Sequence, residues 1–300
     1  MTPQARLQRA GPCIAGILPC VNKTIPLASN WHAELDLEYR RVGERTLLAA
    51  QRRRGPLCVQ KALYPEGDAI CHSIILHPPG GIAAGDQLYL GVDLGPGSHS
   101  LLTTPGASKW YRSDDAEAAQ QLHFTLAPGA MLEWLPQETI LFRGTRARLD
   151  CTIDLAPGAL FLGWEVLCFG RRASGEIFDG GRLSLTSRIS QSGKSLWRER
   201  GRVDGASAFL TSPVGLAGCS VSATLILAGT DLDRSVLDRL REIVPADGAK
   251  HGITLLPQLA VARYLGDSNE AARGWMIGLW SVLRPAVFGR PAQAPRIWST

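Results

Sequence analysis

A short motif of leucine, a small residue, proline and glycine recurs along the chain and sets a repeat length for its fold. It occurs three times, and its leucines, Leu94, Leu126 and Leu155, are 32 and 29 residues apart. Proline presets φ at one turn position and glycine tolerates a positive φ at the next, so each motif predicts a tight turn. The arms beside these turns alternate between apolar and polar residues, as half-buried β-strands do. A single hairpin cannot bury its apolar face alone, so a unit of about 30 residues predicts β-hairpins stacked in succession.

The predicted β structure fills the first two thirds of the chain. The repeats give strand–turn–strand units at residues 88–102, 122–135 and 149–167, and similar hairpins are expected at residues 32–51 and 183–203. The predicted fold class is mainly β, with stacked β-hairpins that form packed sheets in the manner of a β-helix, and with a small α/β C-terminal part that carries two helices.

The sequence changes character near residue 230, where apolar residues begin to recur at helical spacing. The expected elements are a helix over residues 231–244 with Asp231 as its N-cap, a strand over residues 254–264, and a helix over residues 268–287 with Asp267 and Glu270 spaced as a capping box. The expected organisation is an N-terminal extension at residues 1–30 and a single domain at residues 31–300, divided into a β body at 31–228 and an α/β part at 229–300.

The composition is that of an ordinary globular protein, with 45% hydrophobic and 20% charged residues. The net charge of +5 owes much to arginine clusters such as residues 52–54, and the sequence lacks the dense aromatic and basic interleaving of nucleic-acid binders. An acidic protein partner accounts for these charges as well as RNA does. No stretch approaches the roughly 20 apolar residues of a membrane-spanning helix. The seven cysteines contain no CxxC pair and suit a reducing compartment, so we expect a cytoplasmic protein.

Two short segments resemble catalytic signatures but lack a glycine that each signature needs. Gly193-Lys194-Ser195 resembles the end of a phosphate-binding loop, but Arg188 stands where the first glycine is required. Ser108 would need glycine at position 110 to form a nucleophile elbow, and Trp110 occupies that position. We therefore expect a hairpin turn at the first segment and no enzymatic activity.

Cys71, His72 and His77 are of the ligand types that zinc, copper and nickel prefer. Cys71 and His72 are adjacent in a predicted strand, so they point to opposite faces and cannot both bind one ion without a bulge. A buried cysteine beside a hydrogen-bonded histidine is the favoured interpretation, and contact of these residues with a metal stays open.

Five blocks of the sequence together resemble the family of urease accessory proteins called UreD or UreH. The blocks are HPPGGIAAGD (77–86), LLTTPGASKWYRS (101–113), EWLPQETILF (133–142), LGWEVLCFGRRASGE (162–176) and PRIWST (295–300). They occur in the order of the family, and the resemblance covers about residues 31 to 300. The joint match is highly specific, whereas each block alone would be weak.

The resemblance implies a β-rich, non-catalytic chaperone for urease maturation. Such a protein binds two other maturation proteins, UreF and the GTPase UreG, and docks with apo-urease. Nickel passes from the GTPase partner through this complex to the urease site, and no cofactor is held tightly. Neither nucleic acid nor a membrane is an expected partner, and a dimer can form through the partner complex.

Members of the family are thought to offer nickel an internal route lined by carboxylates and hydroxyls. The matching positions are Asp86 in GGIAAGD, Ser108 in PGASK, Glu165 in GWEVLC and Glu199 in WRER, whose surroundings match the family poorly. Weak oxygen ligands suit an ion in transit, because several thiolates or imidazoles would retain it. Gln87 stands where relatives often carry glutamate, which reduces the charge beside Asp86. An alternative for Glu165, which lies in an apolar strand, is an ion pair with Arg171 or Arg172.

Two other functions stay open at this level. One is a β-sheet carbohydrate-binding module that stacks sugars on Trp110, Tyr111, Trp134 and Trp164. The other is a hydrolase built on Ser108, His77 or His99, and Asp86.

Overall fold

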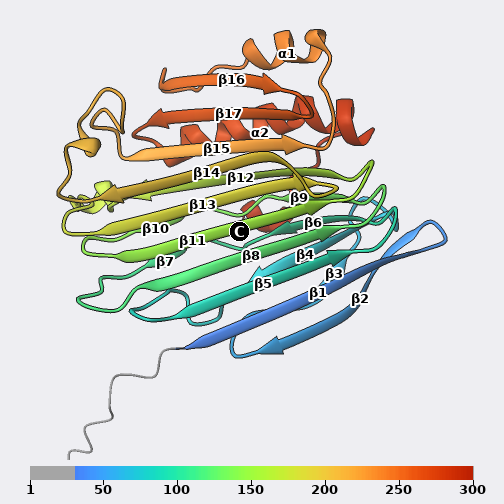
Figure 1. Ribbon diagram of the computed structural model, residues 1–300, viewed down its shortest axis with the longest axis horizontal. Coiled ribbons are helices and arrows are strands. Elements are labelled where there is room, and N and C mark those ends of the chain that lie inside the picture. The colour runs from blue at the N-terminus through green and yellow to red at the C-terminus, as the bar shows by residue number, and fades with distance from the viewer. Residues whose placement is uncertain (1–30, 300) are drawn as a thin grey trace, which may run out of the picture.

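The computed structural model describes residues 31–299, in which two β-sheets face each other and two α-helices cover the outer side of one sheet (Figure 1). The predicted N-terminal extension at residues 1–30 lies outside the described residues. The seven-stranded sheet contains, in spatial order, β14 (Lys194–Asp204), β13 (Arg182–Gln191), β11 (Arg146–Leu155), β8 (Ala118–Leu126), β5 (Gln87–Leu94), β1 (His32–Val42) and β2 (Arg45–Arg54).

The ten-stranded sheet lies behind it in Figure 1. It contains, in spatial order, β16 (Lys250–Leu256), β17 (Leu259–Gly266), β15 (Val221–Ala228), β12 (Leu160–Phe169), β9 (Met131–Trp134), β6 (His99–Thr103), β4 (Ile70–Leu76) and β3 (Cys58–Leu63), with β10 (Thr139–Leu141) paired to β12 and β7 (Ser108–Trp110) paired to β10. The helices are α1 (Arg234–Arg241), α2 (Asn269–Phe288) and the short 3-10 helices η1 (Arg172–Ser174), η2 (Ala208–Leu210) and η3 (Arg296–Ser299).

Each repeat crosses from one sheet to the other at its Pro-Gly turn. The turn after Leu94 joins β5 to β6, the turn after Leu126 joins β8 to β9, and the turn after Leu155 joins β11 to β12. Each arm pairs in parallel with the equivalent arm of the next repeat. The mainly β, β-helix-like class with two C-terminal helices is confirmed, but the connection within each repeat is an arch and not the expected hairpin.

Arches form because both arms of a repeat carry apolar side chains on the side that the turn encloses. These side chains pack between the sheets, and the backbone groups of each arm then pair with neighbouring repeats. The turns also bond to one another, since Ala127 N donates to Leu94 O and Ala156 N donates to Leu126 O, both at 2.9 Å. Gly129 in the second turn has a φ of 69°, which favours glycine. The repeats therefore stack through their turns as well as through their strands.

The hairpins predicted at the two ends of the repeat region are confirmed. β1 pairs antiparallel with β2 across the turn at Gly43-Glu44, and β13 pairs antiparallel with β14 across Ser192-Gly193. Ser192 and Gly193 have φ values of 49° and 78°, as a two-residue hairpin turn requires. The segment that resembles a phosphate-binding loop is therefore a turn that enters a strand.

Two expectations for the C-terminal part need correction. α1 begins at Arg234 and not at residue 231, because the Asp231 carboxylate accepts a hydrogen bond from Gln258 N (2.8 Å) instead of capping the helix. The strand expected over residues 254–264 is two antiparallel strands, β16 and β17, since the chain reverses at Gln258, whose φ is 57°.

The second helix, α2, is confirmed, but its N-cap is Ser268. The Ser268 hydroxyl accepts a hydrogen bond from Ala271 N at 3.1 Å. Asp267, expected to take part in a capping box, instead accepts hydrogen bonds from the backbone N–H (2.9 Å) and hydroxyl (2.8 Å) of Ser220. It thus connects the start of α2 to the residue that precedes β15.

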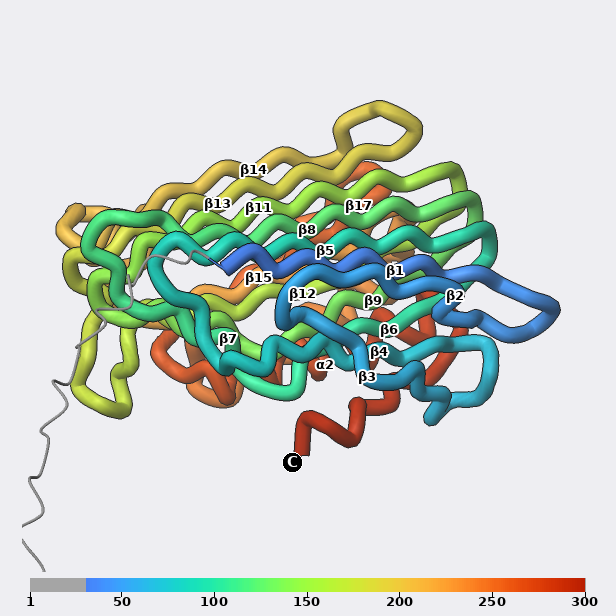
Figure 2. Tube along the Cα trace, turned by 90° about the horizontal axis from the view of Figure 1, so that it is seen from below, coloured from blue at the N-terminus to red at the C-terminus, as the bar shows by residue number. Residues whose placement is uncertain are grey.

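The ten-stranded sheet is covered on both faces, so the molecule has two apolar cores. Along β12, Phe161 and Leu167 face the seven-stranded sheet, whereas Leu162 and Val166 face the helices. Figure 2 shows α2 on the side of this sheet that faces away from the seven-stranded sheet. Double coverage explains why β12 reads as a nearly continuous apolar run. Within residues 31–299, no helix combines the length and the apolar composition needed to cross a lipid bilayer.

A buried ionic cluster fixes α2 to this sheet. Arg284 of α2 and Glu133 of β9 have no exposed surface, and Arg284 Nε lies 3.0 Å from Glu133 Oε2. The other guanidinium nitrogens of Arg284 donate to both carboxylate oxygens of Glu66, at 2.6 and 2.8 Å. Trp280, one turn earlier in α2, donates to Glu133 at 2.7 Å. One arginine thus connects the helix to two carboxylates of the β body.

Two histidines complete the cluster. His99 bonds Glu133 at 2.9 Å and His72 bonds Glu66 at 2.7 Å. Burial by itself would raise the pKa of both carboxyl groups, but the hydrogen bonds and charges of the histidines and Arg284 outweigh it. The pKa of Glu133 is lowered, and that of Glu66 is lowered to about 2. Both glutamates are therefore ionised at neutral pH, and Arg284 places one positive charge between them.

We expect Arg284→Met to lower the free energy of unfolding by roughly 3–5 kcal/mol, because it leaves two carboxylates buried without the arginine. Arg239→Met, which changes an exposed arginine of α1, is the matched control and should cost less than about 0.5 kcal/mol. Urea unfolding followed by circular dichroism measures both. Equal unfolding midpoints for the two variants would show that the cluster does not fix α2.

Candidate functional site

Two adjoining cavities lie between the sheets and are bordered by three of the four residues predicted for a nickel route. Their volumes are about 370 and 160 Å³. Ser108 borders the larger cavity, Glu199 borders the smaller one, and Glu165 borders both. The other residues that border both are Gln120, Leu122, Trp134 and Trp164. Glu165 therefore lies where the two cavities meet.

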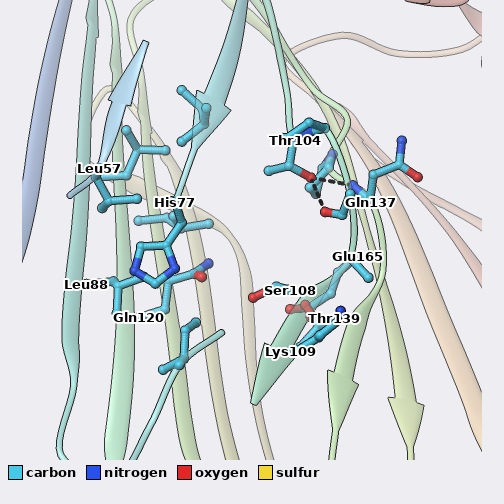
Figure 3. Close-up of a pocket in the computed structure, with 18 of the residues that line it drawn as sticks. Leu57, His77, Leu88, Thr104, Ser108, Lys109, Gln120, Gln137, Thr139 and Glu165 are labelled. Atoms are coloured by element: carbon cyan, nitrogen blue, oxygen red, sulfur yellow. Dashed lines mark hydrogen bonds between the residues drawn. The ribbon is translucent and has the colours of Figure 1, made fainter. Parts of the chain in front are cut away.

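The larger cavity lies beside an interruption of the ten-stranded sheet. Residues 104–107 separate β6 from β7, and residues 135–138 separate β9 from β10. These two segments leave the sheet together, because the Thr104 hydroxyl accepts a hydrogen bond from Gln137 N at 2.9 Å. Ser108 stands at the first position after the interruption, on the same side of the cavity as Thr104 (Figure 3).

Strand alternation places the Glu165 side chain between the two sheets. Its neighbours in β12, Trp164 and Val166, face the helices, so the carboxylate faces the cavities. Glu165 has no hydrogen-bond or ion-pair partner among residues 31–299. Burial, with a further contribution from the charge of Glu199, raises the pKa of Glu165 to about 7. It is a half-buried carboxylate that faces the cavities and has no partner among the described residues.

The alternative in which Glu165 pairs with a nearby arginine does not match the structure. Arg171 forms an ion pair with Glu176 at 2.6 Å. Arg172 donates a hydrogen bond to Gly218 O at 3.3 Å. Both arginines are exposed in the loop after β12, outside the space between the sheets.

Two rows of side chains line the smaller cavity, one from each sheet. On the seven-stranded sheet, the register of β8, β11, β13 and β14 aligns Leu122, Cys151, Ser187 and Glu199. On the ten-stranded sheet, the register of β12, β15 and β17 aligns Glu165, Thr224 and Arg263. The row from the seven-stranded sheet changes from an apolar side chain at β8 to a charged one at β14. The row from the ten-stranded sheet ends with the positive charge of Arg263 at β17. There, Arg263 Nη2 donates to Glu199 Oε1 at 2.7 Å.

Ser108 contributes a hydroxyl to the larger cavity but is not part of a catalytic triad in the described chain. Its oxygen accepts a hydrogen bond from Trp110 Nε1 at 3.1 Å. His77 lies across the cavity from it (Figure 3), and His99 bonds Glu133 in the cluster under α2. No histidine among residues 31–299 is hydrogen-bonded to Ser108, so the geometry gives no support to the hydrolase hypothesis.

Asp86 stands apart from the other three predicted residues. Its two carboxylate oxygens accept hydrogen bonds from Ala83 N (2.8 Å) and Trp31 N (3.2 Å), so it stabilises the turn before β5. It does not border either cavity, but it is close to His77, which borders the larger one. Burial lowers the pKa of His77, and the charge of Asp86 partly opposes this shift. Asp86 therefore influences the larger cavity through the electrostatic effect of its charge on His77.

Cys71 and His72 lie on opposite faces of β4, as strand alternation predicts. Cys71 is in the core between the sheets, and His72 bonds Glu66 on the other face. In the part of the chain that the structure describes, no three His, Cys, Asp or Glu side chains are grouped so that they could hold a metal ion. The oxygen donors along the cavities are separate from one another, which suits weak binding at successive positions.

The aromatic residues considered for carbohydrate binding do not form a surface. Trp110, Trp134 and Trp164 are 1%, 8% and 4% exposed, and they pack in the two cores. Tyr111 is the exposed member of the set, and its ring packs edge-on against Phe142. The three buried rings present no open stacking surface, so the geometry gives no support to the carbohydrate-binding hypothesis.

Cys151, Thr224 and Arg263 also line the smaller cavity, and sequence reasoning did not select them. The alternation within the third repeat could have placed Cys151 on the inner face of its strand. No sequence signal identifies Arg263, because its contact with Glu199 joins residues that are 64 positions apart.

We expect Glu165→Gln to raise the free energy of unfolding by about 2–3 kcal/mol at pH 8 and to leave it nearly unchanged at pH 4. The pKa of Glu165 is about 7 in the folded protein, against 4.5 for the unperturbed group. As the pH rises from 4.5 to 7, the unfolded chain loses this proton before the folded chain does. Ionisation therefore costs stability across this range, and glutamine removes the cost.

Urea unfolding of both proteins from pH 4 to pH 8 measures this difference. Glu242→Gln, which changes an exposed side chain at the end of α1, should alter the unfolding free energy by less than about 0.5 kcal/mol throughout. A difference between wild type and Glu165→Gln that does not vary with pH would contradict the enclosed, unpaired state of Glu165.

Comparison with known proteins agrees with the resemblance seen in the sequence. The model of the family described as "UreD urease accessory protein" matches residues 32–299. A urease accessory protein UreD of Dechloromonas aromatica (strain RCB) is 54% identical over 274 residues, which is 90% of this chain and 95% of the relative. Those of Azoarcus sp. (strain BH72) and Nitrosococcus oceani are 50% and 48% identical, over 90% and 96% of this chain and 94% and 97% of the relatives. The chain therefore belongs to the UreD family of urease accessory proteins.

Proposed function

We propose that this protein is a non-catalytic scaffold of urease maturation that passes nickel from a GTPase partner to apo-urease. Its membership of the UreD family supports a role in urease maturation. The observation that carries the nickel route is Glu165, a half-buried carboxylate where two cavities meet, without a partner among residues 31–299. Withdrawing such a group from bulk water without a partner is costly, so its presence needs a reason beyond stability.

The donors along the two cavities have the chemistry that a transit route needs. Ser108, Glu165 and Glu199 offer oxygen ligands at successive positions from the larger to the smaller cavity. Oxygen ligands bind nickel more weakly than thiolates or imidazoles, so an ion can leave one position for the next. The pKa of Glu165, about 7, means that roughly half of these side chains are protonated at neutral pH. An arriving cation would displace that proton.

The partners in this proposal are a UreF-type protein, a UreG-type GTPase and apo-urease, assembled in the cytoplasm. The segment that resembles a phosphate-binding loop is a hairpin turn between β13 and β14, so GTP hydrolysis is assigned to the partner. Nickel is cargo and not a resident cofactor. A dimer would form through the partner complex, and Asp86 would support the route by its charge near His77.

We expect Glu165→Gln to reduce nickel insertion into urease by at least roughly tenfold, because loss of one charged ligand contact costs about 1.4 kcal/mol or more. Glu199→Gln should have the same direction of effect. Asp93→Asn, which changes an exposed carboxylate of β5, is the control. Urease activity and nickel content per urease subunit are measured after co-expression with the maturation proteins.

Co-purification of the accessory complex shows whether each variant still assembles. We expect intact complexes with nickel-poor urease for the two glutamate variants, and normal urease for Asp93→Asn. Fully metallated urease with Glu165→Gln would refute the proposed route.

A further inference from the structure

The smaller cavity opens between the sheets where β14, the edge strand of the seven-stranded sheet, lies opposite β17. Glu199 of β14 belongs to the seven-stranded sheet and Arg263 of β17 to the ten-stranded sheet, so their ion pair spans the gap between the sheets. The side chains are 31% and 49% exposed, which places the pair at the surface end of the cavity. Glu165 stands at the inner end of the same cavity.

Arg263 has a second contact that keeps it at this position. Its guanidinium lies 5.9 Å from the centre of the Trp197 ring, which comes from the same strand as Glu199. Among the described residues, Trp197 Nε1 is buried without a hydrogen-bond partner, and the guanidinium lies over the face of the indole. Because the Arg263 side chain is 49% exposed, its guanidinium borders solvent as well as the indole.

We propose that Arg263 is a resident counter-cation that closes the β14–β17 mouth of the smaller cavity, and that a divalent cation binds Glu199 only by displacing it. This inference rests on the proposed function, because it assigns a gate to the same route. It concerns the regulation of the mouth and not the existence of the route.

The charges at this mouth explain how displacement and return can both occur. Arginine stays protonated at every physiological pH, so Glu199 has a positive partner whenever the cavity holds no cation. An ion pair that is partly exposed is weak, and a doubly charged ion can compete with it. When the cation leaves, Arg263 returns and compensates Glu199 again. Release then does not leave two unpaired carboxylates, Glu165 and Glu199, facing one cavity.

A purely structural role for the pair makes a different prediction. If Arg263 only held the sheets together, its removal would lower stability and leave the intrinsic affinity for nickel unchanged. If it competes with the cation, its removal raises the affinity, and the increase depends on Glu199. Nickel affinity therefore separates the two roles.

The test is equilibrium dialysis of the full chain against Ni²⁺ at pH 7.5 and low salt. We expect Arg263→Gln to tighten nickel binding about fivefold, the factor that corresponds to about 1 kcal/mol. The same substitution in a Glu199→Gln background should change the affinity less than about twofold, because the competed ligand is gone. Arg200→Gln is the matched control. Arg200 directly follows Glu199 in β14, but its side chain is exposed on the outer face of the sheet.

Arg263→Lys keeps the positive charge. It shows whether a change of nickel affinity in Arg263→Gln comes from the lost charge or from disturbed folding. We expect its nickel affinity to stay within about twofold of wild type. Unchanged affinity in Arg263→Gln, or an equal increase in the Glu199→Gln background, would overturn the gate. The outcome is separable from the proposed function: a failed gate leaves Glu165→Gln unable to deliver nickel, whereas a failed route leaves Glu165→Gln with normal urease activation.

Discussion

The in-register stacking of the arches is the constraint on which the rest of the structure depends. Parallel pairing aligns Leu94 with Leu126 and Leu126 with Leu155, so each turn lies on the turn of its neighbour. A slip of one residue would send every inward side chain of an arm to the outer face. The turn-to-turn hydrogen bonds and the buried leucines oppose such a slip together. One register therefore fixes the composition of both inner faces along several strands.

The pairing of the strands also sets which side chains line the cavities between the sheets. Pairing of β11 with β13 and of β13 with β14 aligns Cys151, Ser187 and Glu199, and the facing sheet aligns Glu165 with Thr224. Polar side chains in a sandwich core normally cost stability, and here they occur in rows that end at β14 and β17. The interruption of the ten-stranded sheet beside Ser108 leaves space that the repeats do not fill. The larger cavity is therefore a consequence of where regular pairing stops.

The C-terminal helix completes the second core by a different interaction. Arg284 satisfies Glu133 and Glu66 away from water, and the sheet that carries Glu133 is the one that carries Glu165. Glu133 and Glu165 differ in both pairing and pKa. Glu133 is paired and has a lowered pKa, whereas Glu165 has no partner among residues 31–299 and has a raised pKa. The contrast separates a carboxylate that holds α2 to the sheet from one whose charge the described chain does not compensate.

Local spacing and turn chemistry were enough to predict the repeat length, the alternation within each arm, the two end hairpins and the two helices. The sequence also marked Glu165 as an acidic residue in an apolar strand. That the arms form arches depends on tertiary contacts, since the backbone groups of an arm can pair either within its own repeat or with the next one. The bond from Trp31 N to Asp86 and the pairing of Arg263 with Glu199 depend on them as well. These contacts join residues far apart in the chain, and no local pattern encodes them.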